Sequence, residues 1–272
     1  MFVVSDSQDA TSVILREWLA DSRRGRIVDL GDLESSLPLR AQRLAFVRNA
    51  CVDLVREGEE SGWDHLIVVD LDNVLVAPVS TDAFAEAAHW LDAEPARGGV
   101  FANGSPRYYD IWALRHEVWC SHDCWQRVWF RDPDENRLEL EIREVFARMI
   151  KIPLWSSPVR VLSAFGGIGL YKLKFTTAAY YVGLDVQGRE TCEHVAFNAS
   201  VRTAGGNLYI YPALVTRSPI EHFDHFRDFP LRLRPAMVIQ RMLMAIRWWR
   251  GAPLDRWPTH ALRRLRPKSK LP

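Results

Sequence analysis

The chain has 272 residues, a formal net charge of +1 at neutral pH and an apolar fraction of 48%. A chain of this length and composition can bury one sizeable hydrophobic core, and its near-balanced charge argues against a dedicated nucleic-acid binder. Its four cysteines are too few for a disulfide framework, so we expect a reducing compartment such as the cytoplasm.

The first residues, 1–6, contain no basic stretch followed by a long apolar one and reach an acid at Asp6. This pattern predicts that no secretory signal is cleaved from the chain. The sequence also lacks a run of about 18 apolar residues, the length that a membrane-spanning helix needs.

The first hundred residues alternate between strand and helix patterns. Because such alternation is typical of βαβ units, it predicts an α/β fold with a mixed, mostly parallel central sheet. In the first helix, apolar spacing predicts that Val13, Ile14, Trp18 and Leu19 face the core. The predicted strands are 2–5, 26–30, 65–71 and 99–102, and the predicted helices are 9–20, 42–57 and 82–91.

The remaining residues continue with a charged helix, two short strands and two further helices. The patterns predict helices at 135–149, 191–201 and 234–250, and strands at 159–162 and 207–211, the last ending at Pro212. We therefore expect one α/β domain over residues 1–230 and a basic, amphipathic helical tail over residues 231–272.

Two acidic residues follow a continuously apolar segment at 66–69. Such a segment is typical of a central strand buried on both faces, and open α/β sheets bind ligands at the carboxyl ends of their strands. Asp70 and Asp72 stand at that end, and residues two apart in an extended chain face the same side. Because Mg2+ and Mn2+ prefer carboxylate oxygens, the triplet predicts a metal site that leaves positions open for phosphate oxygens.

The same triplet permits a second interpretation. Residues 67–75 also resemble the first motif of haloacid-dehalogenase-type phosphatases, in which Asp70 would be the nucleophile and Asp72 the acid and base. That family also needs a later lysine and a further acidic cluster, which the sequence does not offer clearly.

Two non-enzymatic interpretations remain open. One is a sugar-binding protein without activity, for which replacing Asp72 would change nothing measurable. The other is a zinc-binding protein, although one residue between ligands is not the usual spacing of a zinc knuckle. Its candidate ligands are Cys120, His122, Cys124, Cys192 and His194.

Four segments favour a transferase. Residues 40–49 and then 63–72 resemble the R-x-x-R-N helix and the D-x-D strand of glycosyltransferases with the GT-A (Rossmann-like) fold. Residues 108–115 resemble the Y-D-x-W-A-L-R region of the fungal capsule-associated α-1,3-mannosyltransferases and their bacterial relatives. The glycine-rich stretch 165–169 is similar to the loop that lets backbone approach the donor sugar or acceptor in these enzymes.

The resemblance implies a role for residues along most of the chain. Glu193 would be the catalytic carboxylate, with His194 where many family members have a second acid, and Asp110 would contact sugar. Donor contacts would come from Arg43, Arg48, Asn49, Asp70, Arg115, Gly166 and Gly167, and the metal ligands would be Asp72, Asp70 and His222, with His225 as the alternative to His222.

The implied reaction moves a sugar from a UDP- or GDP-linked donor to a glycan or a lipid-linked acceptor, with Mn2+ or Mg2+ and in capsule, cell-wall or exopolysaccharide synthesis. The transition state resembles an oxocarbenium ion, and negative charge grows on the departing diphosphate. If the anomeric centre inverts, Glu193 would take the acceptor proton; if it is retained, Glu193 would position or stabilise instead.

The C-terminal segment is strongly basic. From Arg232 onward the sequence has eleven Arg or Lys and one acid, Asp255. Apolar and basic residues alternate over 234–250, a mixture that suits an anionic membrane surface. We therefore expect a peripheral location on the inner face of a membrane, with packing on the core or in a homodimer as the alternatives.

Overall fold

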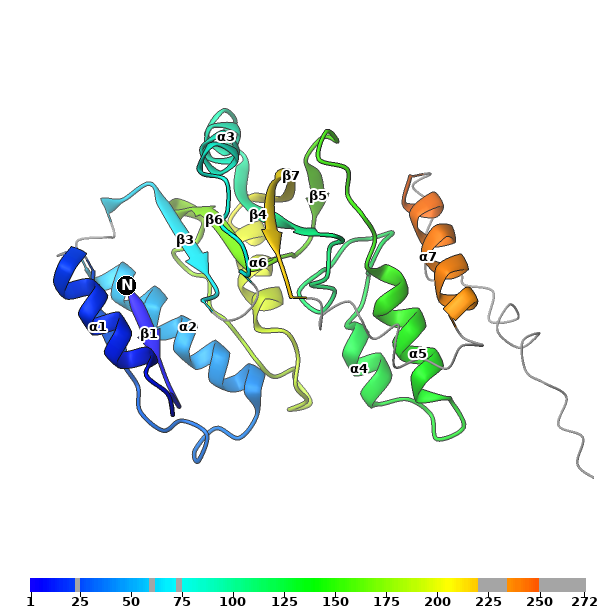
Figure 1. Cartoon of the computed structure of the whole chain (residues 1–272), viewed down its shortest axis with the longest axis horizontal. Coiled ribbons are helices and arrows are strands. Elements are labelled where there is room, and N and C mark those ends of the chain that lie inside the picture. Colours follow the sequence, from blue (N-terminus) through cyan, green and yellow to red (C-terminus); the bar gives the residue numbers. More distant parts are fainter. Residues whose placement is uncertain (23–24, 59–61, 72–74, 220–233, 250–272) are drawn as a thin grey trace, which may run out of the picture.

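The computed structural model describes residues 1–22, 25–58, 62–71, 75–219 and 234–249 (Figure 1). Its strands are β1 (Phe2–Val4), β2 (Ile27–Asp29), β3 (His65–Val69), β4 (Arg97–Ser105), β5 (Val159–Val161), β6 (Ile168–Lys172) and β7 (Asn207–Arg217). Its α-helices are α1 (Thr11–Ser22), α2 (Arg40–Glu57), α3 (Thr81–Asp92), α4 (Cys124–Trp129), α5 (Arg137–Glu144), α6 (Glu193–Thr203) and α7 (Arg234–Trp249). Two 3-10 helices, η2 (Phe146–Arg148) and η3 (Leu173–Phe175), complete the elements named here.

The strands form two sheets. β1 and β2 pair in parallel, and the other five strands form a sheet in the order β3-β6-β4-β7-β5. In the larger sheet β3, β4 and β7 run in one direction and β5 and β6 in the other, so that β4 and β7 are parallel neighbours. The predicted α/β fold with a mixed sheet is confirmed, and among the described strands of the larger sheet one pairing is parallel and three are antiparallel.

The strand that leads to Asp70 differs from its prediction in one respect. In the described part of the chain, β3 lies at one end of the sheet and pairs only with β6. Ile67 is 49% exposed and Val69 is 39% exposed, so β3 is not buried on both faces. A continuously apolar run does not by itself separate a central strand from a half-exposed one.

The central strand is β4, which the sequence predicted as a shorter strand. All of its residues from Gly98 to Gly104 are buried. On one face of the sheet, Val100 and Ala102 pack against Ala87 and Leu91 of α3. On the other face, Phe101 contacts Tyr171 and belongs to the largest core cluster, which also contains Phe197 and Val201 of α6. The sheet therefore lies between helices on both faces.

The last strand is longer than predicted. β7 continues past Pro212 to Arg217. Ala102 of β4 pairs with Tyr211 and the next residue, Asn103, pairs with Val215, so residues 212–214 form a bulge in β7. Proline has no backbone N–H for the ladder, and a bulge is one of the few places where a strand accepts it. The side chain of Asn103 donates to the carbonyl of Pro212 at 3.0 Å and holds this bulge.

Two helix predictions need correction. Of the four predicted inward side chains of α1, three are more than half exposed, Val13 by 53%, Ile14 by 59% and Trp18 by 55%, and Leu19 is half-buried. The predicted helix 135–149 ends as α5 at Glu144 and continues as the 3-10 helix η2. Glu144 and Arg148 are buried in an ion pair there, which explains why this charged stretch turns into the core.

Helix α7 packs against η2 and α5. Ala245 lies against the largest core cluster, and the guanidinium of Arg241 donates to the carbonyl of Phe146 at 3.0 and 3.3 Å. In Figure 1, α1 and β1 lie at one end of the molecule and α7 at the other. Among the described residues, none of the helices combines the length and apolarity needed to cross a membrane.

Candidate active site

A cavity of about 270 Å3 lies where α2, the end of β3 and the N-terminus of α6 meet. It collects residues that are far apart in the sequence but were predicted to act together. Among the predicted site residues, it is lined by Arg48, Asp70, Asp110, Glu193 and His194.

One face of α2 forms a wall of this cavity. Arg40, Leu44 and Arg48 all line it, and their spacing of four residues places them on the same side of a helix. The start of α2 is held by Glu190, whose Oε1 accepts the backbone N–H of Ala41 at 2.7 Å. Arg40 is exposed, and no described residue forms an ion pair with its guanidinium.

Arg48 joins two carboxylates from distant segments. Its guanidinium donates to Oδ1 of Asp70 at 2.7 Å and to Oε1 of Glu193 at 3.0 Å. Burial disfavours the charged guanidinium, but Asp70 and then Glu193 outweigh this effect, so the pKa of Arg48 is raised above its usual value. The Arg48 cation also lies over the ring of Phe165, 5.2 Å from its centroid. The charge of Arg48 is therefore fixed, and it compensates the buried Glu193.

Asp110 is the third carboxylate of the cavity. Its Oδ2 accepts the backbone N–H of Gly166 at 2.9 Å, and its Oδ1 accepts that of Ala113 at 3.3 Å. Burial raises the pKa of Asp110 to about 6, partly opposed by these two hydrogen bonds and reinforced by the charges of Glu193 and Asp70. A carboxylate with this pKa exchanges protons near neutral pH, as general acids and bases do.

The glycine-rich segment positions two of the carboxylates. Gly166 and Gly167 have φ values of 69° and 88°, which side chains rarely adopt. The N–H of Gly166 is bonded to Asp110, and the carbonyl of Gly167 accepts the N–H of Asp70 at 3.1 Å. A Cβ on Gly166 would lie 2.4 Å from the carbonyl oxygen of Ala102. Neither glycine lines the cavity, so in this structure they support the carboxylates.

His194 is a buried histidine with unusual surroundings. Both of its ring nitrogens are buried without a hydrogen-bond partner, and its Nε2 lies 3.6 Å from Oε1 of Glu193, beyond hydrogen-bond distance. Its ring stacks on Phe165 with centroids 3.8 Å apart. Burial and the nearby Arg48 lower the pKa of His194 well below its usual value, so the imidazole is neutral. Buried polar atoms without partners are uncommon in proteins, and these lie beside the cavity.

Aromatic side chains form a further part of the cavity wall. The ring of Trp112 is held by its indole N–H, which donates to Oδ2 of Asp123 at 3.2 Å, and by an edge contact with Trp129. Trp125 stacks on the same Trp129. The aromatic residues that line the cavity are Tyr109, Trp112, Trp125, Phe146 and Phe165.

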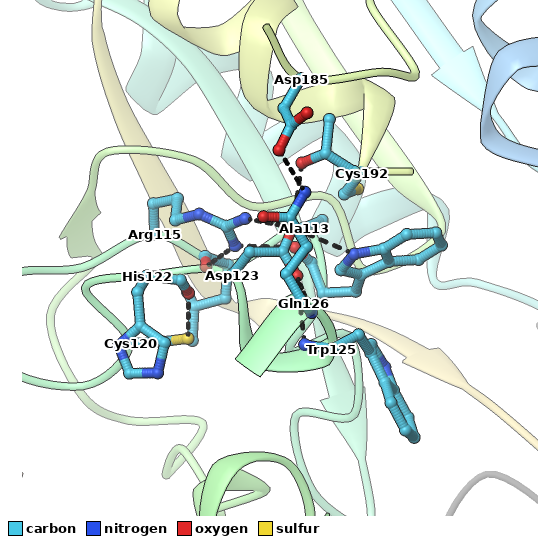
Figure 2. A network of polar contacts seen from close by, with 12 residues as sticks. Ala113, Arg115, Cys120, His122, Asp123, Trp125, Gln126, Asp185 and Cys192 are labelled. Carbon is cyan, nitrogen blue, oxygen red and sulfur yellow. Dashed lines mark hydrogen bonds and ion pairs between the residues drawn. The ribbon is translucent and has the colours of Figure 1, made fainter. Parts of the chain in front are cut away.

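Asp123 organises the segments behind this wall. Its Oδ1 caps α4 by accepting the N–H groups of Trp125 and Gln126, at 3.1 and 3.0 Å. Its Oδ2 accepts the guanidinium of Arg115 at 2.8 Å and the hydroxyl of Thr191 at 2.9 Å (Figure 2). One buried carboxylate thus ties α4 to the segments on either side of the cavity.

Three predicted donor contacts lie elsewhere. Arg43 donates to the carbonyls of Leu37 and Pro38, both at 2.9 Å. The amide of Asn49 exchanges two hydrogen bonds, of 2.8 and 2.9 Å, with the backbone of Tyr181. The guanidinium of Arg115 is bonded to Asp123 and to two backbone carbonyls. The structure does not bring these three side chains to the cavity.

The predicted metal ligands are only partly described. Asp72, His222 and His225 lie outside the described residues. Asp70 offers a carboxylate at the cavity whose Oδ1 is bonded to Arg48, and its side chain is 27% exposed. Oxygen of this kind suits Mg2+ or Mn2+, but within the described ranges no group of three potential ligands comes together. Asp70 is therefore one possible ligand of a set that the described residues do not complete.

The zinc interpretation is wrong for the described residues, which include all five proposed ligands. His122 instead lies with its Nε2 3.0 Å from Oε2 of Glu144, and the thiol of Cys120 donates to the carbonyl of His122 at 3.4 Å (Figure 2). His194 stacks on Phe165 at the cavity. The thiols of Cys120 and Cys124 interact with each other, but the five side chains form no common ligand sphere.

Several cavity residues were missed from the sequence. Arg40 shares its helix face with Arg48, and the four-residue spacing of Arg40, Leu44 and Arg48 was a usable signal. Trp125, Val145, Phe146 and Met149 carried no such signal, because their position depends on how α4 and η2 pack.

No protein-family model matches the sequence, and no curated protein matches it. Among solved structures, the chain is similar to a mannosyltransferase, PcManGT from Pyrobaculum calidifontis, in complex with GDP-Man and Mn2+, at 16% sequence identity and a TM-score of 0.41. The match covers 90% of this chain and 54% of that one, so the chain spans about half the length of that protein. A likeness at this level does not identify a function.

Proposed function

We propose that this protein is a glycosyltransferase of the GT-A type that takes a sugar from a UDP- or GDP-linked donor. One observation carries the proposal: the cavity at the carboxyl end of β3 combines an arginine held between two carboxylates, a third carboxylate with a raised pKa, and an aromatic wall. Phosphate, sugar hydroxyls and flat rings are the groups that such side chains bind. The proposed acceptor is a glycan or a lipid-linked sugar in capsule, cell-wall or exopolysaccharide synthesis.

In this proposal, Arg40 is the cationic side chain that binds the diphosphate. Arg40 is exposed on the cavity wall and has no competing carboxylate among the described residues, whereas Arg48 lies deeper and is already neutralised by two. Arg40 therefore presents an uncompensated positive charge to an incoming anion. Trp112 and Trp125 offer flat surfaces on which the sugar or the base would stack.

A divalent cation, when bound, would offset the negative charge that develops on the departing diphosphate. Asp70 would be one of its ligands, with Asp72 and His222 as the further ligands that the sequence implies.

In this proposal, Asp110 accepts the proton and Glu193 holds Arg48 in place. The pKa of Asp110, about 6, makes it largely ionised at neutral pH yet basic enough to accept the proton of an acceptor hydroxyl. Glu193 is 3% exposed and bonded to Arg48, so it suits holding Arg48 in place better than exchanging a proton. His194 contributes a neutral imidazole to the lining, and its two ring nitrogens are buried without a hydrogen-bond partner.

The phosphatase alternative has less support. A phosphatase of the haloacid-dehalogenase type would need Asp70 as nucleophile and a lysine close to it. The described residues that line the cavity include no lysine, and Arg48 occupies Oδ1 of Asp70. A transferase that uses Asp70 as an anchor fits these contacts better.

The test is a screen of UDP- and GDP-sugars by thermal shift and by donor hydrolysis, with and without Mn2+. We expect at least one sugar nucleotide to stabilise the protein and to be hydrolysed slowly, and we expect Asp70→Asn to abolish both effects. Asp53→Asn is the matched control, because Asp53 lies on α2 with its side chain 45% exposed and outside the cavity. No response to any nucleotide would refute the proposal, and release of orthophosphate from simple phosphomonoesters would favour the phosphatase.

A further inference from the structure

Helix α7 exposes a continuous apolar face. Its members are large, and each is 41–62% exposed: Val238, Ile239, Met242, Leu243 and Ile246. At about 100° per residue, these positions lie within roughly 140° of the helix circumference. An exposed apolar patch of this kind on a soluble domain marks an interaction surface.

Contacts on the opposite side of α7 attach the helix to the protein and leave this apolar face exposed. Ala245 packs against the core, and the guanidinium of Arg241 donates to the carbonyl of Phe146 at 3.0 and 3.3 Å. Phe146 also lines the candidate active site. The helix is therefore attached directly behind one wall of the cavity, with its apolar face turned away from the protein.

The sequence that follows α7 supplies positive charge. Residues 250–272 contain a single acid, Asp255, and seven basic residues: Arg250, Arg256, Arg263, Arg264, Arg266, Lys268 and Lys270. Each basic residue near an anionic lipid surface contributes about 1 kcal/mol of attraction. An apolar helical face followed by a basic segment is the combination that binds such a surface in the plane of the headgroups.

We infer that the apolar face of α7 docks on an anionic phospholipid membrane, with residues 250–272 reinforcing the attachment through their charge. The attachment sets the cavity close to the bilayer, so a membrane-borne acceptor would meet the active site without leaving the lipid; this last point rests on the proposed function. The docking itself does not, because it concerns a surface outside the cavity.

Liposome flotation of the full-length protein tests the inference. We expect the parent protein to float with vesicles of phosphatidylglycerol and phosphatidylcholine and to stay in solution with phosphatidylcholine alone. The double variant Val238→Asp and Ile239→Asp should lose at least about tenfold in partitioning, because it removes two apolar groups and adds two negative charges. Raising the salt concentration should weaken binding of the parent, because salt screens the attraction between the basic segment and the anionic lipid.

The chain offers a matched control. Val13 and Ile14 are an adjacent Val-Ile pair on α1 that is 53% and 59% exposed, at the other end of the molecule (Figure 1). The variant Val13→Asp and Ile14→Asp should float like the parent. Equal flotation of the two double variants, or no flotation of the parent, would overturn the inference. So would sedimentation showing that the parent is a dimer without lipid and that the α7 variant is a monomer, because the face would then join two copies of the chain. These readouts use no sugar nucleotide, so they fail or succeed independently of the transferase.

Discussion

Arg48 and Glu193 are 145 residues apart in the sequence, yet Nε of Arg48 lies 3.0 Å from Oε1 of Glu193. The pair connects α2 to the first residue of α6, and Asp70 at the end of β3 shares the same guanidinium. A buried carboxylate needs such a partner, since an ionised group without one is costly in the protein interior. The integrity of the cavity therefore depends on Arg48.

Replacing Arg48 by Gln should lower the free energy of unfolding by about 3–5 kcal/mol, because Glu193 would remain buried without compensation. Denaturant unfolding at neutral pH measures the change. The double variant Arg48→Gln and Glu193→Gln should recover a large part of the loss, since it removes both charges. A loss below about 1 kcal/mol for the single variant would contradict the buried ion pair.

The pH dependence of transfer should report on Asp110. Its pKa of about 6 lies above the ordinary carboxyl value of 3.8, so the group favours the folded state at low pH and this contribution is lost as pH rises through about 6. Deprotonation over the same range creates the base. Activity should therefore rise through pH 6 to a plateau, and Asp110→Asn should lower kcat by about 100-fold or more and remove the acidic limb. A limb that survives in Asp110→Asn would assign the base to another group.

Two glycines with positive φ should differ in their tolerance of alanine. Gly166→Ala should cost about 3 kcal/mol, because it combines backbone strain with a contact of 2.4 Å to the carbonyl oxygen of Ala102. Gly188→Ala should cost about 1 kcal/mol, since Gly188 has a φ of 74° but nothing within 4 Å of an added Cβ. Chemical denaturation of the two variants measures both values. Equal costs would show that the close approach of Gly166 to β4 is relaxed in solution.

Glu144 should stabilise the protein above pH 4.5. Burial would raise its pKa, but the hydrogen bond to His122 and the charges of Arg148 and Arg143 outweigh burial, so the pKa of Glu144 lies below its usual 4.5. Its contribution is therefore present above that pH and lost as the pH falls below it. Glu144→Gln should cost about 3 kcal/mol at pH 7, because Arg148 is left buried, and less at pH 3.

The matched control for Glu144 is Glu141→Gln on the same helix. Its partner Arg137 has a side chain that is 60% exposed, and such a pair contributes below about 0.5 kcal/mol. Unfolding of both variants at the two pH values gives the comparison. A similar cost for both would contradict a special role for the buried network.

Arg40→Gln should weaken binding of GDP or UDP by about tenfold while leaving thermal stability almost unchanged, because Arg40 is exposed and forms no ion pair with described residues. Titration calorimetry measures the affinity. Arg16→Gln is the control, since Arg16 is on α1 with its side chain 61% exposed. Equal affinities of the parent and Arg40→Gln would exclude Arg40 from donor binding.

The fold was largely predictable because it rests on local patterns. The strand and helix patterns of residues 1–100 reappear as β1 to β4 and α1 to α3. The order of strands was not predictable, because it depends on pairings such as that of β4 with β7, which join residues such as Phe101 and Ile210. For the same reason, the half-exposed position of β3 could not be read from its apolar run.

The sequence predicted those site residues whose chemical type and position along the chain are recognisable. Acidic residues at the end of a strand or the start of a helix, such as Asp70 and Glu193, have a recognisable context, and the structure brings both to the cavity. Arg43 and Asn49 lie close to Arg48 in the sequence, but on a helix a shift of one residue turns a side chain by about 100°, so they bond to other segments. Trp125 and Phe146 were not predicted, because their place in the cavity depends on tertiary packing alone.

The central strand also has a consequence for biosynthesis. Val100 of β4 pairs with Leu170, and Phe101 pairs with Ile210, so both neighbours of this buried strand are translated long after it. A nascent chain thus carries the apolar segment from Gly98 to Gly104 without a partner until β6 and then β7 leave the ribosome. Late pairing of this kind slows folding and exposes a strand that other chains can join. The protein should therefore depend on chaperones during synthesis more than the fully paired state of β4 in the final sheet would suggest.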